Sequence, residues 1–252
     1  MTTEQAQPRL RVERRGDALL VGLDRPDKHN ALDEQAVDEF HAVLAEAARR
    51  PAVLVVHSTT PGVFAAGADI AELRERRADD ALRAINAGLF ARLAAHRWPT
   101  VAAVDGPALG GGCELALACD LRLATARSSF GQPELSLGIL AGAGANSRLP
   151  ALVGLGTARR MLYLGERLDG AAALQAGLVD ALHEPDALLD AALATAGTIA
   201  RRSWRALELT KLSLRSQAPD TTTFDITAQA LLFDSEDKHA RMSRFLERRK
   251  DA

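Results

Sequence analysis

The sequence is poor in cysteine and in aromatic residues, and neither sign of charge dominates it. Its 252 residues include two cysteines, Cys113 and Cys119, whose spacing suits neither a zinc site nor a disulfide framework. A reducing, cytoplasmic setting fits this cysteine usage best. The net charge of −2 gives no electrostatic basis for binding nucleic acid or an anionic membrane surface.

Long hydrophobic runs are also missing. No stretch approaches the roughly 18 uninterrupted apolar residues of a membrane span, and residues 1–8 lack the apolar segment of a signal peptide. The hydrophobic fraction of 47% and the charged fraction of 25% are typical of a globular protein. This length suits one large domain, or one domain with a small appendage.

Strands and helices alternate through the first half of the chain. Apolar runs on both sides of Gly16-Asp17 predict an antiparallel hairpin. Asp33 is placed to cap a helix with apolar residues at helical spacing, and Asp69 with Glu72 predicts a capping box. This alternation predicts an α/β fold. The predicted strands are 10–14, 18–23, 52–57, 101–104 and 121–124, and the predicted helices are 33–49, one from Asp69, 78–96 and 112–118.

The second half is mostly helical, with a single predicted strand at 178–182. We therefore expect an α/β core over residues 1–190 and a helical C-terminal region over residues 191–252, with a soft boundary near 185–200. The predicted helices are 143–153, 157–164, 170–175, 187–201, 203–216, 222–233 and 236–249.

Three consecutive glycines, Gly110-Gly111-Gly112, precede one of the predicted helices. They have a plain explanation in close packing between a helix and a strand, or in a turn. The functional alternative is that the Gly111 amide, at a helix start, stabilises an oxyanion. The loop 64–69 has small side chains and precedes another helix start, so it offers a second donor.

Two glutamates follow these glycines. Glu114 lies in an otherwise apolar helical run, where a carboxylate is either on an exposed turn or has a function. Glu134 follows Pro133 and has the alternative explanation of a first-turn glutamate favoured by the helix dipole. Two neighbouring carboxylates beside an oxyanion site could move protons during enolate chemistry.

Other chemical motifs are excluded or weak. The glycine-rich run 142–147 follows no convincing strand and lacks a third glycine, so it does not predict a dinucleotide site. The sequence has no phosphate-binding loop and no nucleophile elbow. The six histidines form no His-x-x-x-His pair, and we expect no metal site.

Taken together, these segments resemble the crotonase superfamily, and within it the enoyl-CoA hydratases most closely. The resemblance runs through nearly the whole chain in the family's order. It implies a spiral core of repeated ββα turns and a helical C-terminal region that mediates trimers, which usually pair into hexamers. The matching stretches are 23–26, 30–32, 64–70, 102–106, 108–120, 130–134, 148–150 and 176–180.

The resemblance also implies the roles of particular residues. The amides of Ala68 and Gly111 would form the oxyanion hole for a thioester carbonyl. The family chemistry would be the syn addition of water across the 2,3 double bond of an enoyl-CoA. Glu114 would orient and deprotonate the water molecule, and Glu134 would deliver a proton to the α-carbon. No metal or redox cofactor is implied, because coenzyme A is part of the acyl-CoA substrate. Substrate contacts are expected at Ala66, Asp69, Ile70, Gly110 and Gly142.

Two departures from the family pattern concern the substrate. The run 141–147 reads Ala-Gly-Ala-Gly-Ala-Asn-Ser where hydratases commonly have Pro-Gly-Ala-Gly-Gly-Thr-Gln, and Pro107 replaces a common aromatic residue. Both glutamates are present, which favours hydration. A Δ3-Δ2 enoyl-CoA isomerase and a non-catalytic acyl-CoA-binding homologue remain the alternatives.

Overall fold

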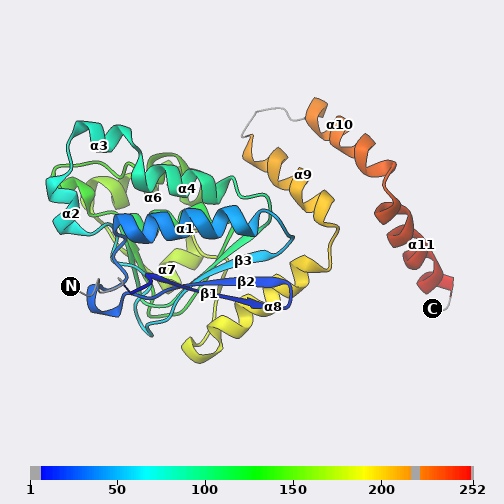
Figure 1. Ribbon diagram of the computed structural model, residues 1–252, viewed down its shortest axis with the longest axis horizontal. Helices are drawn as coiled ribbons and strands as arrows, with labels where there is room; N and C mark the ends of the chain where they lie inside the picture. Colours follow the sequence, from blue (N-terminus) through cyan, green and yellow to red (C-terminus); the bar gives the residue numbers. More distant parts are fainter. Residues whose placement is uncertain (1–6, 217–221, 251–252) are drawn as a thin grey trace, which may run out of the picture.

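The computed structural model describes residues 7–216 and 222–250 (Figure 1). Residues 1–6, 217–221 and 251–252 lie outside the described residues. The prediction that residues 1–8 form no signal peptide therefore falls mostly outside them. The strands are β1 (Leu10–Arg15), β2 (Ala18–Leu23), β3 (Val53–Ser58), β4 (Thr100–Val104), β5 (Pro107–Leu109), β6 (Leu121–Ala124), β7 (Ser129–Gly131), β8 (Leu168–Asp169) and β9 (Ala181–Leu182). The helices are α1 (Glu34–Ala47), α2 (Ile70–Glu75), α3 (Ala78–Leu82), α4 (Ile85–Ala94), α5 (Gly111–Ala118), α6 (Ala145–Leu164), α7 (Gly170–Gln175), α8 (Leu188–Ala200), α9 (Trp204–Arg215), α10 (Thr222–Phe233) and α11 (Glu236–Lys250), with 3-10 helices η1 (Pro26–Lys28), η2 (Glu134–Leu137) and η3 (Pro185–Ala187).

A six-stranded sheet in the order β1-β2-β3-β4-β6-β9 forms the centre of the molecule. The hairpin predicted around Gly16-Asp17 is confirmed, because β1 and β2 pair antiparallel from Leu10 opposite Leu23 to Arg15 opposite Ala18. The other strands pair in parallel. Strand β4 is buried along its whole length, as expected for a continuous apolar strand covered on both faces.

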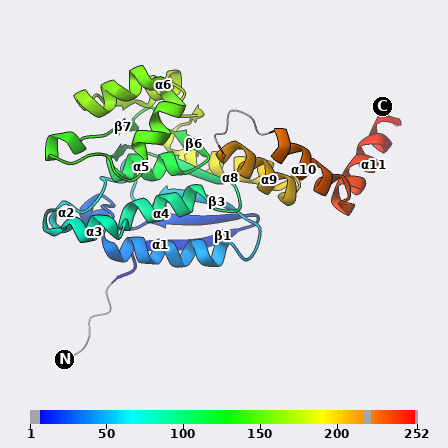
Figure 2. The same ribbon diagram turned by 90° about the horizontal axis from the view of Figure 1, so that it is seen from above.

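Helices cover both faces of this sheet (Figures 1 and 2). On one face α1, α4 and α5 pack around a core that includes Phe40, Phe90 and Leu115. On the other face α8 lies across β3 and β4 and buries Leu188, Ala192 and Ala196. Alternate residues along each central strand therefore enter two different apolar clusters.

A second, three-stranded sheet in the order β5-β7-β8 was not predicted. Its strands are two or three residues long, too short to give a period of two in the sequence. It matters for the site because Leu109 pairs with Gly131, and the Gly110 amide donates to the Gly131 carbonyl at 2.9 Å. The glycine turn and the segment that leads to Glu134 are thereby held side by side.

Several predicted helices differ from the observed ones. The prediction of one helix over 78–96 is wrong, because the helix is interrupted between α3 and α4 at Ala84, which has φ +54°. The capping box at Asp69 is also wrong. The Asp69 carboxylate does cap α2 by accepting from the Ala71 amide at 3.0 Å, but Glu72 accepts from the Glu34 amide at 3.2 Å instead of reaching back.

Further along the chain, one predicted strand is shorter than expected, and two predicted helices form a single helix. The strand predicted over 178–182 is confined to β9. The two helices predicted over 143–153 and 157–164 are joined in α6, which bends at Gly154 with φ +73° and ψ +158°. The cap predicted at Asp33 is confirmed, since its Oδ1 accepts from the Ala36 amide at 2.9 Å.

The C-terminal helices extend away from the sheet (Figures 1 and 2). Helix α9 is tied to the core by Lys211, whose Nζ donates to Asp120 Oδ2 at 2.6 Å and to the Trp98 carbonyl at 3.1 Å. Trp204 adds an edge-to-face contact with Trp98 at 5.5 Å between ring centroids. Helix α8 crosses the predicted boundary at residue 190, and the division into two domains stays a prediction.

Candidate functional site

Two backbone amides lie together at the centre of the candidate site. Gly111 is the first residue of α5, and Ala68 lies just before α2 in a turn that pairs with Leu32. A Cβ built on Gly111 would lie 3.3 Å from the Ala68 nitrogen, so the two turns face each other closely. Neither amide donates a hydrogen bond to another protein group anywhere in the described ranges. Both are therefore available to one oxyanion.

The glycines beside these amides are required for different reasons. Gly110 has φ +51°, and a Cβ there would lie 2.9 Å from Glu134 Oε1. Gly112 packs against the neighbouring loop, where a Cβ would lie 2.2 Å from the Ala65 carbonyl oxygen. Gly112 is therefore explained by close packing of α5 against the loop that contains Ala65, and Gly110 by a turn that requires positive φ.

Glu114 is buried in α5, with 3% of its surface exposed. Its Oε1 accepts from the Ala143 amide at 2.7 Å and from the Ala145 amide at 3.1 Å. Burial raises the pKa of this carboxyl, whereas the two amides favour its ionised form. The exposed-turn explanation is therefore wrong, and the run that departs from the family pattern supplies backbone donors to this carboxylate.

Glu134, at the start of η2, is also buried. Burial, together with the neighbouring charge of Glu114, raises its pKa to about 7 from an ordinary value of 4.5. Gln132 donates to both Glu134 oxygens, at 3.0 and 3.1 Å, when its amide nitrogen faces the carboxyl group. Two carboxyl groups with different environments therefore lie within electrostatic reach of each other.

Residues beyond the predicted set also belong to this arrangement. Gln132 was not assigned a role from sequence, although it is 98% buried and two residues from Glu134. The amides of Ala143 and Ala145 were also missed, because backbone donors leave no side-chain signal in a sequence. The predicted substrate contacts at Ala66, Ile70 and Gly142 are exposed positions, while Asp69 is half-buried and Gly110 is buried.

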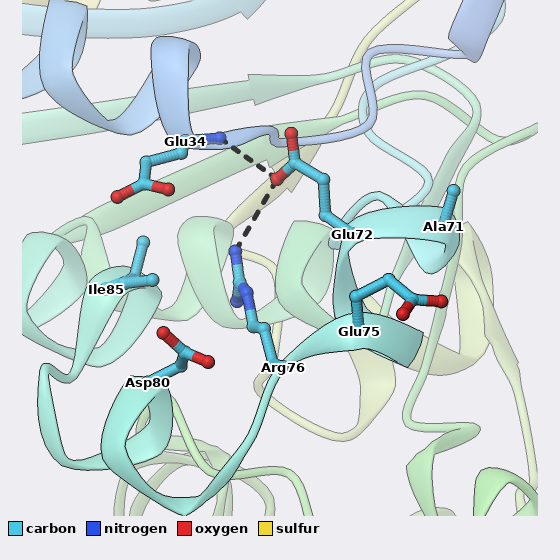
Figure 3. Close-up of a pocket in the computed structure, with 7 residues that line it drawn as sticks. All are labelled: Glu34, Ala71, Glu72, Glu75, Arg76, Asp80 and Ile85. Atoms are coloured by element: carbon cyan, nitrogen blue, oxygen red, sulfur yellow. Dashed lines mark hydrogen bonds and ion pairs between the residues drawn. The ribbon is translucent and has the colours of Figure 1, made fainter.

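A cavity of about 480 Å³ lies outside the candidate site (Figure 3). It is formed between the first turn of α1, helices α2 and α3, and the start of α4, and neither Glu114 nor Glu134 lines it. Four acidic residues and one arginine line it, so it is poorly suited to the phosphates of a coenzyme. Its lining residues are Glu34, Ala71, Glu72, Glu75, Arg76, Asp80 and Ile85.

The described residues include neither a cluster of metal-ligating side chains nor a membrane-spanning helix. Residues 7–216 and 222–250 contain no group of three or more histidine, cysteine, aspartate or glutamate side chains placed to hold a metal ion. Over the same ranges no helix has both the length and the apolar character of a membrane-spanning segment. Cys113 and Cys119 are both buried as free thiols.

Comparisons with known proteins show the family and the fold of this chain. The family model described as enoyl-CoA hydratase/isomerase matches residues 13–252. The short-chain-enoyl-CoA hydratase of Clostridium acetobutylicum is 36% identical, over 95% of each chain, and the 2,3-dehydroadipyl-CoA hydratase of Escherichia coli is 38% identical, over 94% of this chain and 95% of the relative. The solved structure of DspI from Pseudomonas aeruginosa has a TM-score of 0.92 and 31% identity, covering 98% of this chain and 97% of that one. The predicted α/β crotonase-like fold is confirmed.

Proposed function

Because the chain belongs to the enoyl-CoA hydratase/isomerase family, we propose that it adds water across the 2,3 double bond of a 2-trans-enoyl-CoA. The product is a 3-hydroxyacyl-CoA. The observation that carries this proposal is the placement of two buried carboxyl groups, Glu114 and Glu134, around two unpaired amides. The reaction is a hydro-lyase reaction run in the direction of hydration, and the coenzyme A belongs to the substrate.

In this proposal the amides of Ala68 and Gly111 donate hydrogen bonds to the carbonyl oxygen of the thioester. As the oxygen of water bonds to C3, the π electrons of the double bond move toward C2 and the carbonyl, giving a thioester enolate. Each preorganised donor aimed at the developing charge is worth about 2.7–4 kcal/mol in other enzymes. The absence of competing acceptors at these amides in the described ranges supports this role.

The carboxyl groups move the two protons. Glu114, whose Oε1 accepts hydrogen bonds from two amides, orients the water molecule and takes one of its protons. Glu134, whose pKa of about 7 leaves about half of the molecules protonated at neutral pH, delivers a proton to C2. Exchange with solvent then returns both groups to their starting states. One hydroxyl and one hydrogen are added, and the thioester remains intact.

Turnover assays separate this proposal from its alternatives. The purified protein is incubated with crotonyl-CoA in one arm and with a 3-enoyl-CoA in the other, and the absorbance of the conjugated thioester is followed. Loss of absorbance with crotonyl-CoA supports hydration, and gain of absorbance with the 3-enoyl-CoA alone would establish isomerisation instead. Tight binding of both esters without turnover would establish a non-catalytic acyl-CoA-binding protein.

We also propose that the protein is a cytoplasmic homo-oligomer, a trimer or a dimer of trimers, assembled through its C-terminal helices. Apolar side chains on α9 and α10 are exposed, with Leu214 at 77%, Ile226 at 66% and Phe233 at 50%. Such a surface is costly to leave in contact with water. A second copy of the chain would cover it.

Light scattering during size-exclusion chromatography tests the assembly. The wild-type chain is expected to elute at three or six times its mass, and Ile226→Asp is expected to elute as a smaller species. Gln229→Asp is the matched control, since Gln229 is an exposed polar residue of the same helix. A wild-type chain that elutes as a monomer would contradict the proposal.

A further inference from the structure

Arg148 is an unusual residue for its position. It lies in the first turns of α6, where the helix dipole favours anions and disfavours a cation. Its side chain is half-buried, and it forms no salt bridge with a residue of the ranges 7–216 and 222–250. A guanidinium that is removed from water without a carboxylate partner is costly, so its position calls for an explanation.

The guanidinium holds two parts of the molecule together. Its Nη1 donates to the Ala143 carbonyl at 3.0 Å, and its Nη2 donates to the Phe90 carbonyl in α4 at 3.3 Å. It also fills the space beside Gly144, where a Cβ would lie 1.9 Å from Nη1. Arg148 therefore connects the turn 143–145 to helix α4 by one hydrogen bond to each.

The same turn binds the carboxylate of Glu114 on its other side. The amide of Ala143 donates to Glu114 Oε1 while the carbonyl of Ala143 accepts from Arg148. A shift of the turn would change the direction of both amides that bind Glu114. Ala143 alone therefore links the guanidinium of Arg148 to the carboxylate of Glu114. Arg148 forms no hydrogen bond with the amides of Ala68 or Gly111 in the described ranges.

Charge adds to this mechanical link. Burial raises the pKa of Glu114, and the positive charge of Arg148 opposes that rise together with the amides of residues 143 and 145. The other ionisable groups near the pair are Glu134 and Cys113 on the side of the carboxylate, and Arg215 of α9 and Cys119 on the side of the arginine. Arg148 is the only cation that lowers the pKa of Glu114 in the described part of the chain.

We propose that Arg148 is the positioning residue of the general base: it orients the turn 143–145, whose amides hold the carboxylate of Glu114, and it brings a positive charge to this side of the site. The assignment of Glu114 as the base rests on the proposed hydratase function. The sequence is compatible with this role, because Gly144 has no side chain and so leaves the arginine room to reach the Ala143 carbonyl.

The test measures the ionisation of Glu114 directly. Protein labelled with carbon-13 at the glutamate side-chain carboxyl is titrated by NMR, and the Glu114 signal is assigned from its loss in Glu114→Gln. In Arg148→Met the pKa of Glu114 is expected to rise by about one unit, the lower end of the effect of removing a nearby opposite charge. Arg159→Met, at an exposed arginine of the same helix, is the control and should leave the titration unchanged.

A lysine variant separates the charge from the hydrogen bonds. Arg148→Lys keeps the charge but replaces the planar guanidinium, whose two nitrogens each reach one carbonyl, with a single ammonium nitrogen. It should therefore preserve the pKa of Glu114 and lower kcat for crotonyl-CoA, by up to about 100-fold for a base misplaced by 1 Å. KM should change little, because the oxyanion amides are untouched. Arg148→Gln replaces Arg148→Met if the latter does not fold, and if neither folds the kcat of the lysine variant decides.

Three results would overturn the assignment. They are a Glu114 titration unchanged in the charge-free variant, wild-type kcat in Arg148→Lys, or equal effects of Arg148→Met and Arg159→Met. The NMR titration needs no turnover. If the wild-type protein does not hydrate enoyl-CoA, the proposed function fails while the coupling between Arg148 and Glu114 is still measured.

Discussion

Replacing Glu134 with glutamine should make the protein more stable at alkaline pH while impairing its chemistry. The pKa of Glu134 rises from an ordinary value of 4.5 to about 7, chiefly because burial disfavours the charged form. The folded state therefore binds the proton more tightly than the unfolded state. Stability falls as the pH rises from about 4.5 to about 7, since over this range the folded protein retains a proton that the unfolded chain has lost.

The magnitude follows from the two pKa values. Their difference is about 2.5, and at about 1.36 kcal/mol for each unit this gives roughly 3 kcal/mol of lost stability above pH 8. Glutamine has the same shape and stays neutral, so it avoids the loss. We expect Glu134→Gln to be about as stable as the wild type near pH 4.5 and more stable by about 2–3 kcal/mol at pH 8.

Urea denaturation at a series of pH values, with the protein concentration held fixed, measures this difference. Glu184→Gln is the matched control, because Glu184 is exposed and its substitution should shift stability little at any pH. A Glu134→Gln variant whose stability relative to the wild type does not change between pH 5 and pH 8 would refute the reasoning. It would show that burial does not hold the proton on Glu134.

Three further outcomes are expected. Glu114→Gln should lose about 10²–10⁴-fold in kcat for crotonyl-CoA while still binding the ester in a calorimetric titration, and near-normal turnover would exclude Glu114 as the base. The kcat/KM of the wild type should fall as the pH rises through about 7, because Glu134 must carry its proton to act as the acid; a flat alkaline limb up to pH 9 would contradict this role. Lys211→Met should lower the free energy of unfolding, measured by urea denaturation, by about 1–3 kcal/mol, since it leaves the Asp120 carboxylate without its cation. The double variant Asp120→Asn/Lys211→Met should recover part of that loss. If the effects of the two substitutions simply added, Lys211 and Asp120 would not stabilise the fold as an ion pair.

The parts of the fold that could be predicted are those with long, regular patterns. The hairpin β1–β2 and the buried strands β3 and β4 have four or more apolar or alternating residues in a row, and their positions agree with prediction within one or two residues. The break at Ala84 escaped prediction because nothing in its immediate sequence marks a residue with positive φ. The local sequence pattern therefore predicted where the strands and helices lie, but not where a helix is interrupted.

The candidate site divides in the same way. Glu114 and Glu134 could be identified because a carboxylate in an apolar run and a carboxylate after a proline are visible in the sequence. The contact of Glu134 with Gly110 depends on the small sheet β5–β7, whose strands are too short to recognise. The support from Arg148 depends on a carbonyl of α4, 58 residues away, and no local pattern encodes that distance.

The central claim is that this site adds water to an enoyl-CoA by transferring a proton to C2, and hydration of crotonyl-CoA in D₂O tests it most directly. NMR of the product should show a hydroxyl group at C3 and one deuterium at C2, added from the same face of the double bond, with the reaction lost in Glu114→Gln/Glu134→Gln. Crotonyl-CoA that stays unchanged, or a product in which the two additions come from opposite faces, would contradict the account.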